Sequence, residues 1–448
     1  RFADLGYTWD VYVNTNDLEG YTYGPITFAA KQLIEDRHCP IFKRRSFFHD
    51  YHDVLNQSVG NASLGLYEYL RDHTGYDTDL IWQNLLRTVQ LSDLTKNLQL
   101  VRVLSQDNAQ PIPQKFRVAL VLHLYYMDIL DQILRYARSM PEGCDVIITV
   151  GSEEKACIVK ERCEGMPYNI DVRVIENRGR DVSALLVGAG KDVLNYDLVC
   201  FAHDKKVRQL RPETIGDGFA KKCFGNTLAS KAYVANIINL FADNPRLGVA
   251  MPSAPNHADY FYSYAFSWGP NYQGTKDLLD GLGIKVPLSP HADVIAPLGT
   301  MFWFRPKALH GLIDKSWEYS DFPPEPNPAD GSFLHFVERA YCYVAQSNGY
   351  YSEYILSDRF ARLEITNLAF ETRELAKAIG PTLARPTLLE TCRNASASQG
   401  LRATIVRNVK GLIKQNAALT KMALSARHLL GKDPVVHRHE IDPAKDNK

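Results

Sequence analysis

The fold is decided by residues 176–206, which read Glu176-Asn177-Arg178-Gly179-Arg180-Asp181, then a helical segment, then the apolar run Leu198-Val199-Cys200-Phe201-Ala202 and the polar end His203-Asp204-Lys205-Lys206. A glycine-containing polar turn and charge at the carboxyl end of a strand are typical of the place where an α/β sheet binds a phosphorylated ligand. Arg178, Arg180, Lys205 and Lys206 would give this crevice four cations, matching the negative charge of a pyrophosphate.

Strand and helix patterns alternate on both sides of this stretch. Apolar runs predict strands at 116–122, 145–150, 170–175, 198–202, 247–251 and 299–306, and helical spacing predicts helices at 126–140, 153–163, 181–194, 230–243 and 333–347. Mostly apolar strands between helices indicate a parallel sheet covered on both faces, with 170–175 nearer an edge because Asp171 and Arg173 interrupt it. The predicted fold class is α/β, a Rossmann-like sheet with flanking, mainly helical segments.

Composition shifts divide the chain into four predicted parts. Residues 1–110 are mainly helical, with helical spacing at 27–37, 63–73, 80–91 and 94–104, and Pro111 and Pro113 mark a boundary. Residues 111–365 form the sheet domain, 366–432 a helical basic extension and 433–448 a disordered tail. The stretch Leu401–Lys432 has seven basic residues and no acidic ones, which suits either an anionic membrane surface or a helix with a solvated basic face.

Composition excludes several classes of function. The 448 residues carry 51 Lys+Arg against 51 Asp+Glu, so net charge gives no indication of nucleic-acid binding, and no apolar run is long enough to span a membrane. The eight cysteines lack zinc-like spacing, which predicts reduced, mostly buried thiols and a cytosolic protein. The chain opens at Arg1 without a signal-peptide pattern and is expected to be part of a longer protein.

Residues from about 115 to 355 resemble the rhamnan synthesis F family of bacterial polysaccharide assembly. The resemblance is carried by residues 176–181, His203-x-Lys205-Lys206, Gly299-Thr300-Met301-Phe302-Trp303-Phe304-Arg305, and Glu338-Arg339 followed by Gly349-Tyr350-Tyr351. Residues 5–105 also resemble this family, as the tail of a preceding module. The resemblance implies a GT-A-like glycosyltransferase domain at 111–365, with dTDP-L-rhamnose as donor and a rhamnose-containing cell-wall or surface polysaccharide as product.

The donor site is predicted at Asn177, Arg178, Gly179, Arg180, Asp181, His203, Asp204, Lys205 and Lys206. Related transferases hold Mg²⁺ or Mn²⁺ with a DxD motif at the place where this chain has His203-Asp204-Lys205-Lys206. We favour donor-phosphate neutralisation by the lysines and arginines without a metal, because buried cations stabilise a developing oxyanion. The alternative is a divalent metal held by Asp204 with His203. Asp181 either caps the helix that follows the turn or accepts hydrogen bonds from the nucleotide.

Transfer to an acceptor hydroxyl needs a base. Glu338 is the first candidate and Asp330, in the loop before its helix, is the second; His335 shares a helix face with Glu338 and would assist or pack. Trp303 and Arg305 are expected at the sugar and acceptor, with core packing as the alternative for the aromatic residue.

The predicted function is that of an inverting rhamnosyltransferase acting on a growing, lipid-linked polysaccharide. The alternative is a non-catalytic component of a polysaccharide assembly complex that binds a nucleotide-sugar or a glycan. Expected partners are the nucleotide-sugar, a lipid-linked saccharide acceptor and an anionic membrane surface, but no nucleic acid. The expected location is the cytoplasm, with peripheral attachment to the inner face of the plasma membrane as a variant. Oligomeric state is left open.

Overall fold

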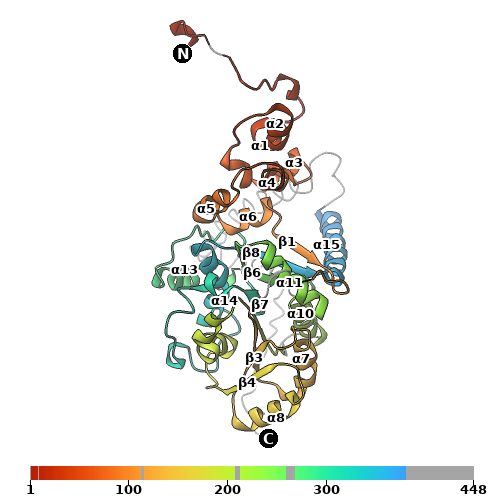
Figure 1. The fold of residues 1–448 in the computed structure, drawn as a ribbon, viewed down its shortest axis with the longest axis vertical. Coiled ribbons are helices and arrows are strands. Elements are labelled where there is room, and N and C mark those ends of the chain that lie inside the picture. The colour runs from red at the N-terminus through yellow and green to blue at the C-terminus, as the bar shows by residue number, and fades with distance from the viewer. Residues whose placement is uncertain (1, 9, 112–115, 207–211, 259–267, 380–448) are drawn as a thin grey trace, which may run out of the picture. The chain divides into compact units, whose positions relative to one another are not determined.

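The fold is taken from a computed structural model, which describes residues 2–8, 10–111, 116–206, 212–258 and 268–379. Residues 1–367 form one compact unit, and a second unit begins at Leu368. In the first unit, the chain runs from the amino-terminal helices into the sheet (Figure 1).

Within the described residues, eight strands form one mixed sheet. They are β1 (Val101–Leu104), β2 (Val118–Leu124), β3 (Asp145–Val150), β4 (Asn169–Val174), β5 (Leu198–His203), β6 (Leu247–Pro252), β7 (Phe302–Phe304) and β8 (Tyr351–Ser357). Their order is β1-β8-β6-β7-β5-β2-β3-β4, and β7 is antiparallel to both of its neighbours while the other pairs are parallel. The carboxyl ends of the parallel strands therefore share one edge of the sheet.

Helices precede the sheet and cover both of its faces. They are α1 (Pro25–Phe28), α2 (Ala30–Arg37), α3 (Tyr51–Gln57), α4 (Ala62–His73), α5 (Asp79–Thr88), α6 (Leu91–Asn97), α7 (Leu130–Ala137), α8 (Glu153–Cys163), α9 (Arg180–Ser183), α10 (Thr214–Gly225), α11 (Lys231–Asp243), α13 (Tyr272–Gly281), α14 (Phe333–Ser347) and α15 (Asp358–Ile379). Figure 1 shows α7, α10 and α11 beside one face of the sheet and α13 and α14 beside the other. The predicted α/β class with flanking helical segments is confirmed.

Most predicted elements are present, and the differences have local causes. The strand at β4 is an edge strand, as its two charged residues predict. The segment predicted as one helix over 181–194 is the short α9 followed by a π-helical turn, Ala184–Ala189, and a 3-10 segment, Gly190–Asn195. The helix predicted over 94–104 ends at Asn97, because Gln99 adopts a positive φ of 49° and the chain leaves in extended form as β1.

The amino-terminal helices are part of the same unit as the sheet. Trp82 of α5 stacks on Tyr351 of β8 with ring centroids 4.4 Å apart, and Arg246 pairs with Asp79 through two contacts of 2.5 and 2.6 Å. The amide of Gln346 donates to the carbonyls of Leu86 and Val89. The predicted boundary near residue 110 therefore does not separate two compact units, because a continuous core joins the helices to the sheet.

Two further expectations concern the whole chain. No helix of the described residues is both long and apolar enough to cross a membrane. The seven cysteines that the described residues include are free thiols, five of them buried, with Cys39 partly and Cys157 fully exposed. The basic stretch Leu401–Lys432 and the predicted tail at 433–448 lie outside the described residues.

Candidate functional site

The candidate site lies at the carboxyl ends of β2 and β5, where buried polar residues replace the apolar ones of the strands. His123 of β2 and His203 of β5 form the last residue pair between these two strands, and Asp204 directly follows His203. One oxygen of Asp204, Oδ2, accepts hydrogen bonds from the backbone N–H groups of Tyr125 and Tyr126, at 2.7 and 2.5 Å. Asp204 thus fixes the loop after β2, and burial raises its pKa to about 6 despite those two hydrogen bonds.

His203 is held by backbone carbonyls on both sides. Its Nδ1 lies 2.9 Å from the carbonyl oxygen of Asp204, and its Nε2 lies 2.9 Å from that of Gly299. Both ring nitrogens are thus directed at backbone carbonyl oxygens, and which of them donates depends on the tautomer.

Asp181 brings the 176–181 turn to this cluster. Its Oδ2 lies 3.9 Å from Nε2 of His203, and its side chain is 17% exposed. Burial raises the pKa of Asp181, but the charges of His203 and Lys205 and the hydroxyl of Thr300 outweigh burial and hold the pKa below its usual range. Asp181 does not act as the helix cap, because Gly179 occupies that position and α9 has no side-chain cap.

The turn itself requires glycine at position 179. Gly179 has a φ of 85°, and a Cβ there would lie 2.7 Å from Cβ of Ser183 and 2.8 Å from Cγ of Phe322. Arg180 follows with a φ of 48°, an unusual conformation for a residue with a side chain. Two successive positive φ values turn the chain sharply, so that Asp181 faces the sheet.

The two arginines of the turn bind the 318–327 loop. Arg178 donates to the carbonyls of Phe322 and Ser320, at 2.7 and 3.1 Å. Arg180 makes a bidentate pair with Glu325, at 2.7 and 2.9 Å, and lowers the pKa of Glu325 to about 2. Asn177 lies exposed before them.

The two lysines lie on the other side, toward α10. Nζ of Lys205 is 4.7 Å from the ring centroid of Phe219, and Lys206 pairs with Asp128 and lies 5.0 Å from the ring centroid of Tyr126. Both line a hollow of about 610 Å³ between α7 and α10, to which Lys221 also contributes and which includes neither arginine of the turn. The structure thus separates the four predicted cations into two pairs, of which the lysine pair faces open space.

Glu338 is buried and its carboxylate is fully engaged. Its Oε2 accepts from the backbone N–H of Gly299, at 2.8 Å, and from the hydroxyl of Thr300, at 2.9 Å, while Oε1 pairs with Arg339. The carboxylate thereby holds a turn in which Gly299 and Thr300 have φ values of 95° and 55°. A β-branched residue at positive φ is strained and persists only where its surroundings fix it. Glu338 supports the turn, which corrects its assignment as the base.

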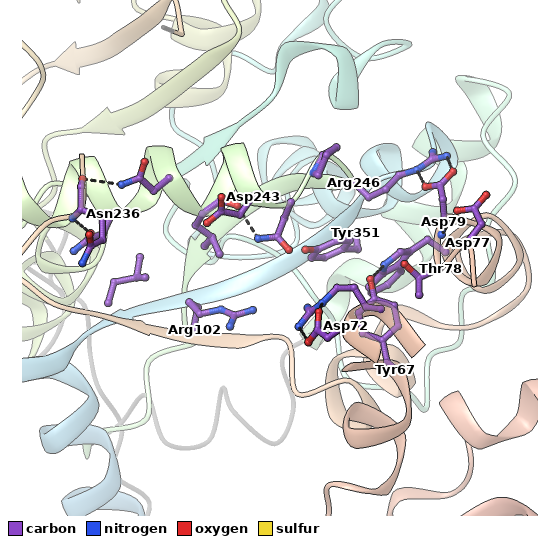
Figure 2. A pocket seen from close by; sticks show the side chains of 18 of the residues that line it. Tyr67, Asp72, Asp77, Thr78, Asp79, Arg102, Asn236, Asp243, Arg246 and Tyr351 are labelled. Atoms are coloured by element: carbon purple, nitrogen blue, oxygen red, sulfur yellow. Dashed lines mark hydrogen bonds and ion pairs between the residues drawn. The ribbon is translucent and has the colours of Figure 1, made fainter. Parts of the chain in front are cut away.

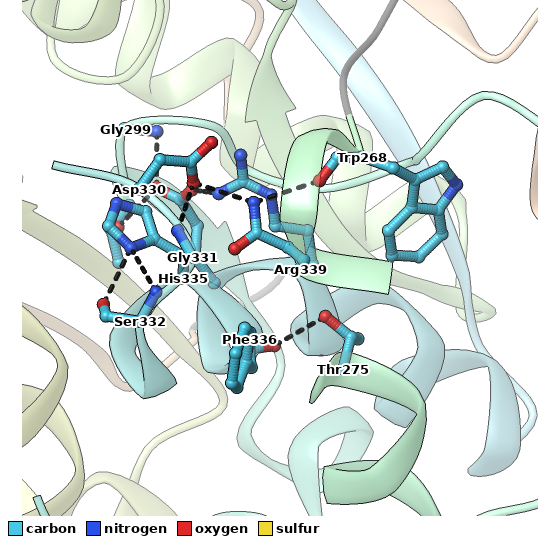
Figure 3. A network of polar contacts seen from close by, with 12 residues as sticks. Trp268, Thr275, Gly299, Asp330, Gly331, Ser332, His335, Phe336 and Arg339 are labelled. Atoms are coloured by element: carbon cyan, nitrogen blue, oxygen red, sulfur yellow. Dashed lines mark hydrogen bonds and ion pairs between the residues drawn. The ribbon is translucent and has the colours of Figure 1, made fainter. Parts of the chain in front are cut away.

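Asp330 has the opposite environment. It is exposed, and its Oδ1 accepts from Nδ2 of Asn271 at 2.8 Å and from the N–H of Gly331 at 2.9 Å. Oδ2 has no hydrogen-bond partner within the described structure. Figure 3 shows Asp330 above the start of α14, with Gly331, Ser332 and His335 beside it. The aspartate is therefore oriented by two donors and keeps one oxygen available.

His335 lies in the first turn of α14, between the loop of Asp330 and Glu338. Its Nδ1 lies 2.8 Å from Oγ of Ser332, so it forms part of the cap of α14. Burial lowers its pKa, and the charges of Glu338, Asp330 and Asp181 act against that shift. His335 therefore belongs to the cap of α14, in the same short stretch as Asp330 (Figure 3).

Trp303 and Arg305 do not face this region. Trp303 of β7 is fully buried and donates its indole N–H to the carbonyl of Thr227 at 2.9 Å. The guanidinium of Arg305 donates to the backbone carbonyls of Leu247 and Phe241. Both assignments to the sugar or acceptor are corrected. Trp303 packs in the core between β5 and β6, and Arg305 fixes the end of α11.

Sequence reasoning missed the turn at Gly299 and Thr300, and it missed Asn271. The signal for the turn was present, since Gly-Thr directly before a strand is an unusual entry into a sheet. Asn271 gave no signal, because its only relevant partner, Asp330, is distant in sequence. Within the described residues no group of three His, Cys, Asp or Glu side chains is arranged to hold a metal ion.

Comparison with known proteins gives a family and two curated relatives. The sequence profile of a family described as rhamnan synthesis protein F matches residues 1–350. The relatives are the uncharacterized protein WxcX of Xanthomonas campestris pv. campestris strain B100 and its counterpart in a second strain of the same pathovar. Each is 28% identical over 221 residues, which cover 49% of this chain and 30% of the relative. The matched region thus spans less than a third of the length of these relatives.

Proposed function

The chain belongs to the rhamnan synthesis protein F family, and we propose that it is a glycosyltransferase that moves L-rhamnose from dTDP-L-rhamnose onto a growing, lipid-linked surface polysaccharide. One observation carries the proposal. At the carboxyl edge of the sheet, the Asp181 carboxylate lies 3.9 Å from Nε2 of His203, at the strand end that continues into Lys205 and Lys206. Such an edge is where α/β sheets bind their ligands.

The donor diphosphate is assigned to the lysine side of the site. Lys205 and Lys206 face the hollow between α7 and α10, and Lys205 is close enough to Asp181 to lower its pKa. The ammonium groups would neutralise the charge that develops on the diphosphate as it leaves. Arg178 and Arg180 have a different part, which is to hold the turn of Asp181 against the 318–327 loop.

The residues do not fit a divalent metal at this place. Both ring nitrogens of His203 face carbonyl oxygens, and one carboxylate oxygen of Asp204 is already engaged by two backbone amides. A metal site would need these ligands free and a third beside them. Neutralisation of the leaving diphosphate is therefore assigned to the lysines.

The transfer is a single displacement with inversion. The acceptor hydroxyl oxygen attacks the anomeric carbon while the bond from that carbon to the diphosphate oxygen breaks, and dTDP leaves with the electron pair. The hydroxyl proton goes to Oδ2 of Asp330, which Asn271 and Gly331 orient through the other oxygen. Glu338 takes no proton and keeps the Gly299–Thr300 turn in place beside His203.

The saturated carboxylate of Glu338 favours one alternative, in which the protein binds a nucleotide-sugar or glycan within an assembly complex without turning it over. A single assay separates the two functions. The full chain is incubated with a panel of nucleotide-sugars and a rhamnose-terminated lipid acceptor, with and without EDTA. The proposal predicts transfer from dTDP-L-rhamnose that EDTA does not abolish. Binding of the donor without any product would support the alternative, and product only from another sugar donor would overturn the assignment of rhamnose.

Two parts of the proposal concern residues or partners beyond the site. Attachment to an anionic membrane surface is assigned to Leu401–Lys432, which lies outside the described residues. The lipid-linked acceptor is assigned because a polymer under assembly needs an anchor that keeps it near the enzyme.

A further inference from the structure

A second hollow lies beside the edge strand β1, away from the proposed donor site. It has a volume of about 960 Å³ and is lined by α4, α5, β1, the end of α11 and the start of β8. Arg246 directly precedes β6 and Tyr351 is the first residue of β8, so one end of this hollow lies at the amino ends of these strands. From there it extends along the edge strand β1 to Leu104, and β8, β6 and β7 lie between β1 and the strand of His203. We call it the amino-edge groove.

The groove has a built polar lining with unsatisfied groups. Arg102 uses Nε to bind Glu353, at 3.1 Å, which leaves its two terminal NH₂ groups without a partner in the described structure. Oδ1 of Asn239, which lines the groove, is buried without a hydrogen-bond partner, as is Oε2 of Glu353, the 1% exposed partner of Arg102 behind the lining. Asp243 also lines the groove; it is exposed and has no ion-pair partner among the described residues. Figure 2 shows Arg102, Asp243 and Tyr351 around the same space.

The aromatic residues of the groove form one ordered stack. Tyr351 packs face to face on Trp82, and Tyr67 meets Trp82 edge-on with ring centroids 5.7 Å apart. Nε1 of Trp82 donates to the hydroxyl oxygen of Tyr67 at 2.9 Å, which leaves the hydroxyl hydrogen of Tyr67 to donate elsewhere. The stack gives the groove a rigid wall with polar tips.

The charges of the lining decide which ligand fits. Arg71, Arg102 and Arg246 face Asp72, Asp77, Asp79 and Asp243, so three positive charges meet four negative ones and the lining has a formal charge of minus one. Arg71 and Arg246 are already paired with aspartates. A nucleotide or another polyanion would find no excess of positive charge there. An apolar segment would cover the guanidinium, carboxylate and amide groups without giving them hydrogen-bond partners, which is unfavourable.

A neutral ligand rich in hydroxyl groups meets all these requirements. Hydroxyls both donate and accept, so they can satisfy Arg102, Asn239 and Asp243 together, and the volume lies at the upper end of the range of about 300–1,000 Å³ typical of ligand sites. We propose that the amino-edge groove binds a neutral saccharide segment of the acceptor polymer, remote from the point of transfer. This rests on the proposed function for the identity of the polymer, but the groove's preference for a neutral saccharide rests on its own lining.

A saccharide site away from the point of transfer would distinguish acceptors by the length of their saccharide chain. A short acceptor occupies only the transfer site, whereas a long chain also fills the groove and gains from being bound at two places. The groove therefore should lower the KM for long acceptors and leave the KM for short ones unchanged.

The test uses the full chain with a rhamnose hexasaccharide, a rhamnose monosaccharide glycoside and dTDP as separate probes, titrated by calorimetry. The variant combines Asp243→Ala with Arg102→Lys, in which lysine keeps a cation for Glu353 but removes the planar NH₂ donors. We expect hexasaccharide affinity to fall at least about tenfold, since hydrogen bonds to charged groups contribute about 1.5–3 kcal/mol. Affinities for dTDP and for the monosaccharide glycoside should be unchanged.

Asp131→Ala is the matched control, because it removes an exposed carboxylate, here paired with Arg162, on another surface. Asp243→Asn is a second groove variant that keeps side-chain size, and thermal melting confirms folding of each. Wild-type affinity for the hexasaccharide in both groove variants would overturn the proposal, as would failure of the wild-type protein to bind it. Absence of dTDP binding with intact, groove-dependent hexasaccharide binding would instead overturn the proposed transferase function and leave the groove standing.

Discussion

The Gly299–Thr300 turn and the Asp330–Gly331 loop each involve one carboxylate, and the two carboxylates are used in opposite ways. Glu338 is buried, accepts two hydrogen bonds on one oxygen and pairs with Arg339 through the other. Asp330 is exposed and accepts both of its bonds on one oxygen only. The difference teaches that a buried carboxylate with hydrogen-bond or ion-pair partners on both oxygens supports the fold. A carboxylate that is oriented through one oxygen and keeps the other free can take a proton.

The largest expected effect is on turnover by Asp330→Asn. The amide oxygen still accepts from Asn271 and Gly331, so the loop should keep its conformation while the proton acceptor is lost. We expect kcat to fall roughly 10²–10⁴-fold with unchanged affinity for dTDP. Initial rates and a dTDP titration measure both quantities.

Asp314→Asn is the control for this variant, since it changes an exposed carboxylate paired with a histidine elsewhere on the surface. Near-normal turnover by Asp330→Asn would show that the proton goes to another group.

Glu338→Gln should mainly affect stability. In this variant a neutral amide replaces the carboxylate, so the buried guanidinium of Arg339 loses its counter-charge. Breaking a buried ion pair costs about 3 kcal/mol or more of the free energy of unfolding. Urea unfolding measures the free energy of unfolding. A variant as stable as the wild type that has nonetheless lost all turnover would restore Glu338 as the base.

The pH dependence of stability tests the burial of Asp204. Its folded pKa of about 6 lies above its ordinary value of 3.8, so the folded protein binds this proton more tightly than the unfolded chain. The resulting stabilisation is present below pH 4 and is lost as pH rises through 6, by roughly 3 kcal/mol. Thermal melting across this range should show a slope that Asp204→Asn lacks, and an identical slope in the variant would contradict the assignment.

The two pairs of cations should differ in donor binding. Replacing Lys205 and Lys206 together by alanine is expected to weaken dTDP binding roughly tenfold or more, because each ammonium is assigned to the diphosphate. Arg180→Ala removes a partly exposed pair with Glu325 and should change dTDP affinity by less than about threefold, consistent with about 0.5 kcal/mol for such pairs. Calorimetry with equal losses in both variants would mean that the arginines also contact the donor.

The sequence predicts the elements better than it predicts the contacts of the site. Strand 145–150 and helices 153–163 and 333–347 have the predicted bounds, since apolar spacing and flanking turn residues specify them locally. The strand β1 was missed because its stability comes from pairing with β8, far along the chain. Local pattern carries no information on such a partner.

For the site residues, too, the sequence predicts which segments are involved better than it predicts their contacts. The predicted meeting of the 176–181 turn with His203 is seen in the contact with Asp181, because both motifs end at one edge of the sheet. The roles of Glu338, Arg178 and Arg180 depend on the 299–300 turn and the 318–327 loop, whose approach results from tertiary packing. Tryptophan is a residue type that often contacts sugars, yet Trp303 is buried because β7 lies between β5 and β6.

The most direct test of the account is a crystal structure of the protein with a non-hydrolysable analogue of dTDP-L-rhamnose. The account predicts that the diphosphate lies within hydrogen-bond distance of Lys205 or Lys206, with the anomeric carbon on the side of Asp330. A nucleotide bound at the amino edge of the sheet, or a sugar with its anomeric carbon turned away from Asp330, would contradict it.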